Sequence, residues 1–208
     1  MIVRGCVHQG GEIRGSGPQL WYNNTPVSAG GTWPFSYNFW HMCRPLLIAT
    51  NNLRNLRVDD IRLTDGPYIH FGADADGMEI SRLRVVTAEW QCRGYSGAPN
   101  TDCVDLSGSD IHVRDSLCHN GDDCFPLLPS FSNYSARGSA PPPPGSDRHG
   151  LTANVLIEDS VCQCGNGVRV MPGIGAPQYG LITNVTYRNV KTMPPEPALL
   201  YMYWMASM

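Results

Sequence analysis

Apolar residues recur along the chain in a short pattern that is typical of β-strands. Two apolar positions two residues apart are followed, after a gap of three, by two more apolar or small positions two residues apart. Alternation of this kind predicts strands whose side chains point in and out in turn, with a bend between the two halves. No segment of comparable length has a helical period of 3.6 residues. The copies of the pattern are Leu56/Val58/Ile61/Leu63, Met78/Ile80/Leu83/Val85, Ile111/Val113/Ser116/Cys118, Val155/Ile157/Ser160/Cys162 and Val185/Tyr187/Val190/Thr192.

The spacing of these copies predicts a solenoid. Met78 follows Leu56 by 22 residues, and the later copies are separated by that length plus an insertion. In a solenoid each strand lies beside the equivalent strand of the next coil, about 4.8 Å away. The alternative is a β-sandwich, whose antiparallel strands are joined by tight hairpins such as Asp65-Gly66 or Asp76-Gly77. The repeat is longer than one hairpin strand and keeps its internal order, which favours an all-β parallel β-helix.

The length of the chain predicts one domain with one long insertion. A chain of 208 residues can bury one substantial core, so we expect a single β-helix domain over residues 1–208. Residues 127–150 read LLPSFSNYSARGSAPPPPGSDRHG, with four consecutive prolines. Such a segment cannot pair as a strand, so it predicts a loop that leaves one coil.

Charge and composition narrow the class of protein. The net charge is −3 and the basic residues are scattered, which argues against a nucleic-acid partner. No apolar segment reaches the roughly 20 residues of a membrane span. The chain has 8 Cys, 22 Gly and 17 Pro, and it has Asn-x-Ser/Thr sequons at Asn23, Asn133 and Asn184. These features favour a secreted, disulfide-bonded glycoprotein over a protein with buried free thiols. We expect a monomer without a cofactor. We also expect no metal, since Cys162-x-Cys164 is too tight for a zinc site.

Aspartates at coil-length spacing are the first candidates for chemistry. Asp122 follows Asp102 by 20 residues, close to one coil, and Asp123 comes next. A solenoid therefore brings them to neighbouring rungs of one face. Clustered carboxylates cannot all ionise freely, so at least one pKa should rise. A glycosidase needs one protonated and one ionised carboxyl, and this arrangement meets that need. The alternative is that Gly121-Asp122 is an ordinary turn pair.

Several motifs in order resemble glycoside hydrolase family 28, the polygalacturonases and their relatives. Asn100-Thr101-Asp102 is similar to the family's Asn-Thr-Asp motif, with Asp105 at its second acidic position. Gly121-Asp122-Asp123-Cys124 is similar to its paired-aspartate motif. The earlier coils resemble the family as well, so that the resemblance covers nearly all of the chain; they are Val3–Trp21, Arg44–Ile48 and Asn55–Tyr68.

The resemblance implies a fold, a reaction and roles for the aspartates. The fold is a right-handed parallel β-helix, and the reaction is inverting hydrolysis of a pectic polysaccharide of the plant cell wall. Asp122 would be the general acid, while Asp102 and Asp123 would orient and deprotonate the attacking water. Asn100 would bind substrate. The family also has a disulfide that corresponds to Cys124 and Cys162, which the resemblance therefore pairs here.

Two motifs depart from the family pattern. Gly165-Asn166-Gly167 stands where the family has Gly-His-Gly, and Leu200-Tyr201-Met202 stands where it has Arg-Ile-Lys. The family's Arg and Lys hold the carboxylate of galacturonate, and each such charged contact is worth roughly 1.5–3 kcal/mol. Three explanations remain open: a less acidic pectic sugar, an inactive relative, or a different cation.

Arg169 is the candidate for that different cation. Counting from Asn166, it holds the in-strand position that the family's Arg holds one coil later, so we expect it one rung from Leu200 on the same face. The alternative is an ordinary surface arginine. Asn100, Asn166 and Arg169 are therefore the predicted substrate-binding residues.

The functional expectation is a polygalacturonase-like glycosidase with two alternatives. One is a non-catalytic carbohydrate-binding or degenerate relative, and the other is a polysaccharide lyase on the same fold. The chain begins inside the family's first coils and stops at the Arg-Ile-Lys rung. We therefore expect the β-helix to be truncated at both ends.

Overall fold

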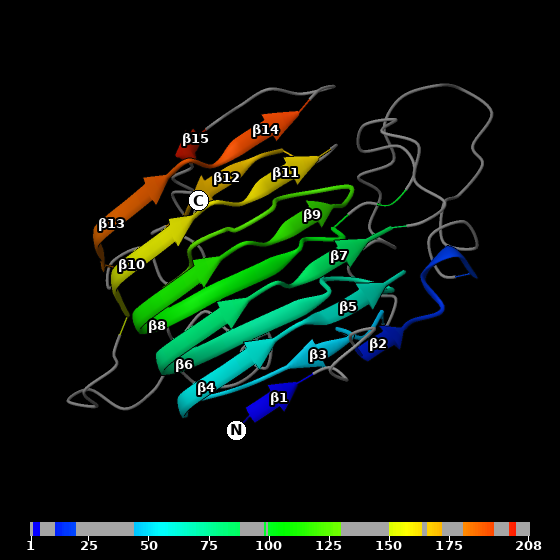
Figure 1. Ribbon diagram of the computed structural model, residues 1–208, viewed down its shortest axis with the longest axis horizontal. Helices are drawn as coiled ribbons and strands as arrows, with labels where there is room; N and C mark the ends of the chain where they lie inside the picture. Colours follow the sequence, from blue (N-terminus) through cyan, green and yellow to red (C-terminus); the bar gives the residue numbers. More distant parts are fainter. Residues whose placement is uncertain are drawn as a thin grey trace, which may run out of the picture.

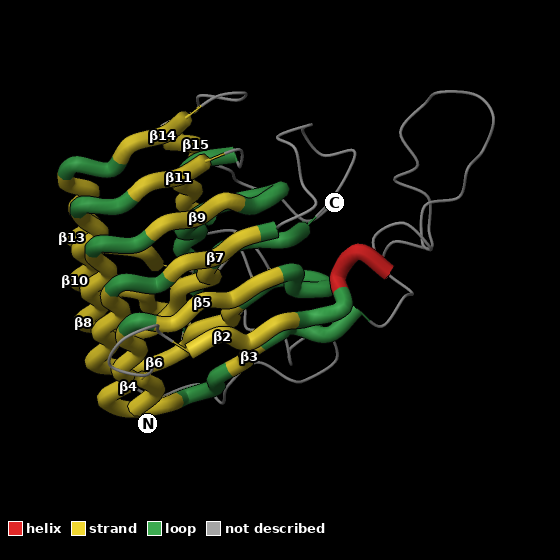
Figure 2. The backbone as a smooth tube through the Cα atoms, turned by 45° about the vertical axis from the view of Figure 1, so that its right-hand side comes forward, coloured by secondary structure: helices red, strands yellow, loops and turns green. Residues whose placement is uncertain are grey.

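The computed structural model describes residues 2–4, 11–19, 44–87, 98, 100–129, 150–163, 166–171, 181–193 and 200–202. These residues form short strands on stacked coils (Figures 1 and 2). The strands are β1 (Ile2–Arg4), β2 (Gly11–Arg14), β3 (Ile48–Ala49), β4 (Leu53–Asp59), β5 (Ile61–Thr64), β6 (Phe71–Ser81), β7 (Arg84–Val86), β8 (Val104–Arg114), β9 (Leu117–His119), β10 (Leu151–Glu158), β11 (Val161–Gln163), β12 (Val168–Val170), β13 (Leu181–Arg188), β14 (Lys191–Met193) and β15 (Leu200–Met202).

Parallel pairing between successive coils defines the architecture. One sheet has the order β1-β4-β6-β8-β10-β13, with β3 also paired to β6, and a second sheet has the order β14-β11-β9-β7-β5-β2. β12 pairs with β15. Each pairing between these strands is parallel, whereas a β-sandwich would need antiparallel hairpins. The fold is therefore the predicted right-handed parallel β-helix.

The register of the strands confirms the repeat read from the sequence. Equivalent apolar residues of successive coils are direct neighbours, so that each column of the pattern becomes a column of the core. One column runs Val58, Ile80, Val113, Ile157, Tyr187, and another runs Leu63, Val85, Cys118, Cys162, Thr192. Ile80, Val113 and Ile157 are fully buried. A buried side chain of this size contributes about 1.5–3 kcal/mol, so the columns hold the coils together.

The bend between the two halves of each repeat has a common backbone conformation. A residue with a positive φ stands there in each repeat: Asp60, Arg82, Asp115, Asp159 and Asn189. Asp and Asn tolerate the left-handed region better than other residues with a Cβ atom. The gap of three residues in the sequence pattern therefore marks a real corner of the coil.

The predicted insertion at 127–150 overlaps the core at its first residues. Leu127 is fully buried and forms parallel bridges with Leu106 and Val170. Leu128 is also buried. Their place in the ladder corrects the start of the insertion, and residues 130–149 lie outside the described residues. Within the described part of the chain, no helix is long and apolar enough to cross a membrane.

Candidate active site

The candidate site lies on loops that stack on successive coils just before their strands. His70 N–H donates to the Asp102 carbonyl at 2.9 Å, and Cys103 N–H donates to the Asp123 carbonyl at 2.9 Å. Cys124 N–H continues the ladder to Gly167 at 2.8 Å. Asp102 and the Asp122-Asp123 pair therefore lie on neighbouring rungs, as the coil-length spacing predicts.

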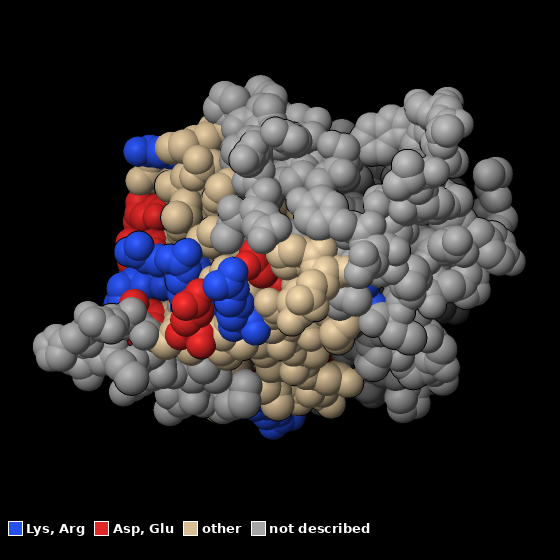
Figure 3. All heavy atoms as spheres, turned by 90° about the vertical axis from the view of Figure 1, so that its right-hand side faces the viewer, with Lys and Arg blue, Asp and Glu red and all other residues tan. Residues whose placement is uncertain are grey.

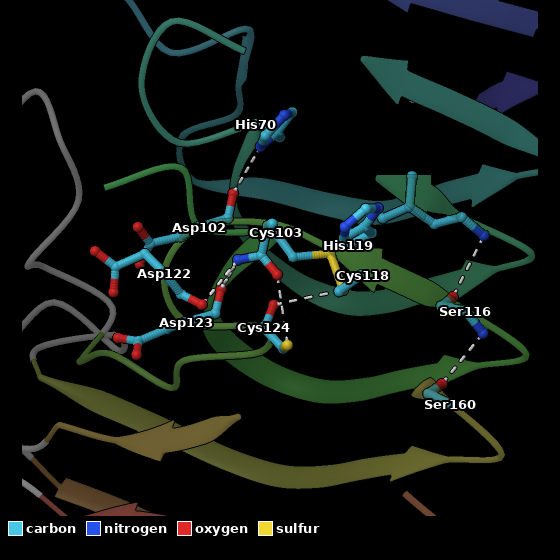
Figure 4. The surroundings of a disulfide bond; sticks show 12 residues. His70, Asp102, Cys103, Ser116, Cys118, His119, Asp122, Asp123, Cys124 and Ser160 are labelled. Atoms are coloured by element: carbon cyan, nitrogen blue, oxygen red, sulfur yellow. Dashed lines mark hydrogen bonds between the residues drawn. A yellow bond between two sulfur atoms is a disulfide. The ribbon is translucent and has the colours of Figure 1, made fainter. Parts of the chain in front are cut away.

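Four carboxyl groups gather at these rungs. Asp102, Asp122 and Asp123 each offer an oxygen atom, and these oxygens lie within 4.8 Å of one another. The charge of Asp105 acts on Asp102, and all four residues are buried. Figure 4 shows the Asp102, Asp122 and Asp123 side chains pointing toward the same space. We call Asp102, Asp105, Asp122 and Asp123 the acid cluster.

Asp122 is held by amide groups from the coils on both sides. Asn100 donates to Asp122 Oδ2 from its backbone N at 3.0 Å and from its Nδ2 at 3.1 Å. Asn166 donates from Nδ2 to Asp122 Oδ1 at 2.8 Å. These donors fix the carboxyl group in place and stabilise negative charge on it. Asn100 and Asn166, both predicted to bind substrate, therefore contact the acid cluster directly.

Burial and mutual repulsion keep protons on the acid cluster. Burial, together with the charges of the other aspartates, raises the pKa of Asp102 and that of Asp105 well above the ordinary value. Burial and the neighbouring Asp122 raise the pKa of Asp123 to about 7. The cluster can therefore store protons near neutral pH.

Arg169 supplies a positive charge to the cluster. Its Nη1 lies 2.9 Å from Asp123 Oδ2, and its side chain is 21% exposed. The guanidinium lowers the pKa of Asp123 and so opposes burial. Arg169 is therefore within reach of the aspartates and accessible to solvent, as predicted.

The predicted register of Arg169 is wrong by one residue. Arg169 pairs with Tyr201, and Leu200 pairs with Val168. Parallel pairing puts paired residues on the same side of the sheet, and Val168 is buried. The position that matches Arg169 one coil later is thus Tyr201, the middle residue of Leu200-Tyr201-Met202.

Arg44 is a second cation near the cluster that the sequence did not single out. Its Cζ lies 5.0 Å from the centre of the Tyr68 ring, and its Nη1 donates to the Pro67 carbonyl at 3.3 Å. Burial lowers the pKa of Arg44, and the charges of Asp102 and Asp122 oppose this shift. Arg44 belongs to a coil that resembles the family, but nothing in the Arg-Pro pair indicates that its side chain lies near the aspartates.

His70 is a buried side chain in the same stack that the sequence also missed. Its ring is fully buried and is hydrogen-bonded to Gly66 and Asp102. No spacing rule connects it to the aspartates, because it lies on the preceding coil. Only the stacking of that coil on the Asp102 rung brings the ring to the site.

The acid cluster also offers the oxygen ligands that a cation would need. Asp102, Asp122 and Asp123 are the described residues that could supply them. The Arg169 guanidinium already provides a positive charge at Asp123.

The cysteines pair differently from the prediction. Cys103 and Cys118 form a disulfide, with Cα atoms 5.7 Å apart, while Cys124 and Cys162 are buried free thiols. Cys162 is the register neighbour of Cys118. The predicted Cys124–Cys162 disulfide is therefore not formed, although Cys162 is near enough to add to the effect of burial in raising the pKa of the Cys124 thiol. Figure 4 shows the Cys103–Cys118 bond beside the aspartates, which ties the Asp102 segment to the strand before Asp122.

Comparison with known proteins identifies relatives for most of the chain. The model of the family described as glycosyl hydrolases family 28 matches residues 3–194. Polygalacturonase QRT2 of Arabidopsis thaliana is 24% identical over 200 residues, covering 88% of this chain and 41% of the relative. Polygalacturonase-2 of Solanum lycopersicum is 25% identical, covering 88% of this chain and 39% of the relative.

A fungal relative is named for a different activity. Rhamnogalacturonase A of Aspergillus niger is 28% identical over 176 residues, covering 82% of this chain and 32% of the relative. The chain thus spans about two fifths or less of the length of these curated relatives.

Proposed function

The chain belongs to glycosyl hydrolases family 28, and we propose that it acts in the hydrolysis of a pectic polysaccharide of the plant cell wall. The observation that carries this proposal is the acid cluster, in which three carboxyl oxygens lie within 4.8 Å of one another. Glycoside hydrolysis needs a carboxyl group that gives a proton and a carboxylate that takes one. The raised pKa values of Asp102, Asp105 and Asp123 show that the site can hold the protons that this chemistry needs.

We assign the proton donor to Asp122 and the activation of water to Asp102 and Asp123. Asn100 and Asn166 hold both Asp122 oxygens, which orients the carboxyl group toward one fixed direction. The proton would reach Asp122 from the neighbouring carboxyls, which hold protons in the free protein. Once Asp122 protonates the leaving oxygen, an ionised neighbour takes a proton from the attacking water.

Inversion at the anomeric carbon is the proposed stereochemical outcome. In inverting enzymes the two carboxyl groups are usually about 6.5–9.5 Å apart, and in retaining enzymes about 5–5.5 Å. In this cluster 4.8 Å separates single oxygens of the three carboxyls, not the carboxyl groups themselves, so it does not decide between the two outcomes. Membership of the family favours inversion, and the proposal rests on it.

The positive charges near the cluster support an acidic sugar as the substrate. Arg169 lies at Asp123, and the charges of Asp102 and Asp122 act on Arg44. Each guanidinium can take a carboxylate through a fork of two hydrogen bonds. A galacturonate-containing chain fits this arrangement. Rhamnogalacturonan is the second candidate substrate, because one relative is named a rhamnogalacturonase.

The proposed setting is extracellular, with the protein acting as a monomer. A Cys103–Cys118 disulfide favours an oxidising compartment. Acidic and basic side chains lie next to one another on the face drawn in Figure 3, which favours a carbohydrate partner over a nucleic acid. The described part of that face shows no broad basic surface.

The direct test is hydrolysis by the purified protein. We expect new reducing ends from polygalacturonate or from rhamnogalacturonan oligosaccharides, without the ultraviolet absorbance of a new double bond. Proton NMR of the first product should show the anomer opposite to that of the substrate, and the same anomer would establish retention. Absorbance would support the lyase alternative instead. Binding without any new reducing ends would support the non-catalytic alternative.

A further inference from the structure

His70 connects the coil before the acid cluster to the backbone of Asp102. It is the last residue before β6, and its side chain is fully buried. Its ring Nε2 accepts a hydrogen bond from the Gly66 N–H at 3.0 Å. Nε2 therefore carries no proton, and the neutral ring must carry its proton on Nδ1. Nδ1 lies 3.1 Å from the Asp102 carbonyl oxygen and donates to it.

Two donors from this one residue hold the Asp102 peptide. The His70 backbone N–H reaches the same carbonyl oxygen at 2.9 Å, so the ring adds a second, directional contact to the ordinary coil ladder. The dashed line in Figure 4 marks the bond between His70 and Asp102. A peptide held by two donors cannot rotate without losing both. The Asp102 backbone, from which the carboxyl group extends, is therefore held in place from the preceding coil.

The packing around the ring leaves it one orientation. A Cβ atom at Gly66 would lie 2.9 Å from the ring Cδ2, so a residue with a side chain there would displace the ring. Burial lowers the pKa of His70 to about 4, and Asp65 is the charged side chain that opposes this shift. The ring is thus neutral over most of the acidic range, and its pattern of one donor and one acceptor persists there.

The contact is transmitted to the next rung of the acid cluster. Asp102 lies between His70 on one side and the Asp122-Asp123 loop on the other, where Cys103 N–H holds the Asp123 carbonyl. A displacement of the Asp102 peptide would change the distance from its carboxyl to those of Asp122 and Asp123. Misplacement by about 1 Å can cost an enzyme about 10²-fold in rate.

We propose that His70 is a positioning residue whose Nδ1–H fixes Asp102 in the acid cluster for catalysis. This inference rests on the proposed function, since it assigns a purpose to the geometry of that site. His70 does not itself reach substrate, because its ring is fully buried. Its role is to set the place of a carboxyl that does.

Three substitutions separate the two ring nitrogens. His70→Asn puts an amide N–H near the place of Nδ1, His70→Gln puts an amide oxygen near the place of Nε2, and His70→Phe keeps the ring volume without either group. His119→Asn is the matched control, because His119 is a partly buried histidine near the same rungs. All variants are compared as the full chain by kcat, KM, the pH profile and thermal unfolding.

We expect His70→Phe to lower kcat by about 10–100-fold with KM nearly unchanged, and to move the pH profile. His70→Asn should recover most of kcat while remaining less stable, because Gly66 N–H has lost its acceptor. His70→Gln should recover stability and not kcat. Equal kcat in the Asn and Gln variants, or an unchanged pH profile in the Phe variant, would overturn the proposal.

A second measurement separates this proposal from the proposed function. If the wild-type protein hydrolyses no pectic substrate, the proposed function fails, and the carboxyl ¹³C titration of Asp102 still tests His70. We expect this titration to shift in His70→Phe and to return toward the wild-type curve in His70→Asn. The same titration in all variants would refute the role of His70. If the Phe variant does not fold, the Asp102 titrations of the Asn and Gln variants are compared instead. The Asn variant should then lie closer to the wild-type curve than the Gln variant.

Discussion

The acid cluster and the outer face of the larger sheet use the same stacking of coils in opposite ways. On the outer face and at the adjoining bends, acidic side chains meet Arg or His across coils, and amide groups bridge the same coils. Glu158 is buried, and the other members remain partly exposed. We call this set the outer ladder; its contacts are Arg57–Glu79, Arg82–Asp59, His112–Glu158, Arg188–Glu158, Asn154–Asp110, Asn184–Asn154 and Asn189–Asp159. In the acid cluster, four buried carboxyls lie together, and the Arg169 guanidinium contacts that of Asp123.

The two regions differ in the direction in which the pKa values of their carboxyl groups shift. In the outer ladder, hydrogen bonds from His112 and Arg188 lower the pKa of Glu158, so that the carboxylate stays charged. In the acid cluster, burial and repulsion raise the pKa values of Asp102, Asp105 and Asp123. A solenoid repeats its geometry every coil, so equivalent side chains of adjacent coils become neighbours. Neighbours of opposite charge stabilise the stack, whereas neighbouring carboxyls raise each other's pKa and form a reactive site.

Replacing Asp122 with Asn should have the largest effect. The amide cannot donate the acid proton, and general acid–base help is worth about 10²–10⁴-fold, so we expect kcat to fall by that factor. Asp110→Asn makes the same change in the outer ladder and should leave kcat unchanged. Circular dichroism and kcat on a pectic substrate check both variants. An Asp122→Asn variant that retained most of the wild-type rate would refute the role of Asp122.

Removing the charge of Arg169 should have the next largest effect. Arg169 lowers the pKa of Asp123, so in Arg169→Gln that pKa should rise above its present value of about 7. A smaller fraction of Asp123 is then ionised in acid, and the acid limb of the kcat/KM profile should move to higher pH. We also expect kcat/KM for uronate substrates to fall by about 10–100-fold, the equivalent of a charged hydrogen bond.

The control for Arg169 is an arginine outside the site. Arg114→Gln removes a guanidinium that pairs with the exposed Asp115, and it should change neither the profile nor kcat/KM. Arg169→Lys should recover part of the activity, since it restores the charge without the planar fork. If Arg169→Gln affected only neutral substrates, the assignment of Arg169 to a sugar carboxylate would be wrong.

Neutralising Asp105 should stabilise the protein as the pH rises. The folded pKa of Asp105 is raised, so the protonated form favours folding. That contribution is fully present below the unfolded pKa of about 3.9 and is lost as the pH rises through the folded pKa. Asp105→Asn avoids the loss, so its Tm should exceed that of the wild type at pH 7 and match it near pH 4.

The size of the Asp105 effect follows from the size of the chain. For a domain of 150–250 residues, Tm rises by about 2–4 °C for each kcal/mol recovered. Asp110→Asn in the outer ladder should show no such dependence on pH. A fall in Tm at neutral pH for Asp105→Asn would mean that the Asp105 charge is stabilising, contrary to its raised pKa.

The repeat made the fold predictable, and coil-length spacing made the aspartates predictable. The columns through Val58 and Leu63 match the sequence pattern position by position, because stacking converts spacing into contact. Asp102 and Asp122 came together for the same reason. Coil-length spacing predicts contacts between residues on adjacent coils, and it predicts nothing about residues that are further apart.

The parts that could not be predicted depend on details within a coil. Cys118 has neighbours both along its column and across the core, and the spacing could not say that Cys103 would be its partner. The register of Arg169 cannot be read from a motif count, and the count from Asn166 was one residue out. His70 and Arg44 carry no spacing signal, and only the stacking of their coils connects them to the aspartates.

Breaking one pair of the outer ladder should have the smallest effect. Arg57 and Glu79 are register neighbours, 3.3 Å apart, and their side chains are 61% and 41% exposed. Water screens such a pair, which typically contributes about 0.2–1 kcal/mol. We therefore expect Glu79→Gln to lower Tm by less than about 4 °C, and less again at high salt. A double-mutant cycle with Arg57→Gln measures the pair itself. If the coupling free energy of this pair exceeded the stability gained by Asp105→Asn, the contrast between the two regions would be wrong. The exposed pair would then have the stronger electrostatic interaction.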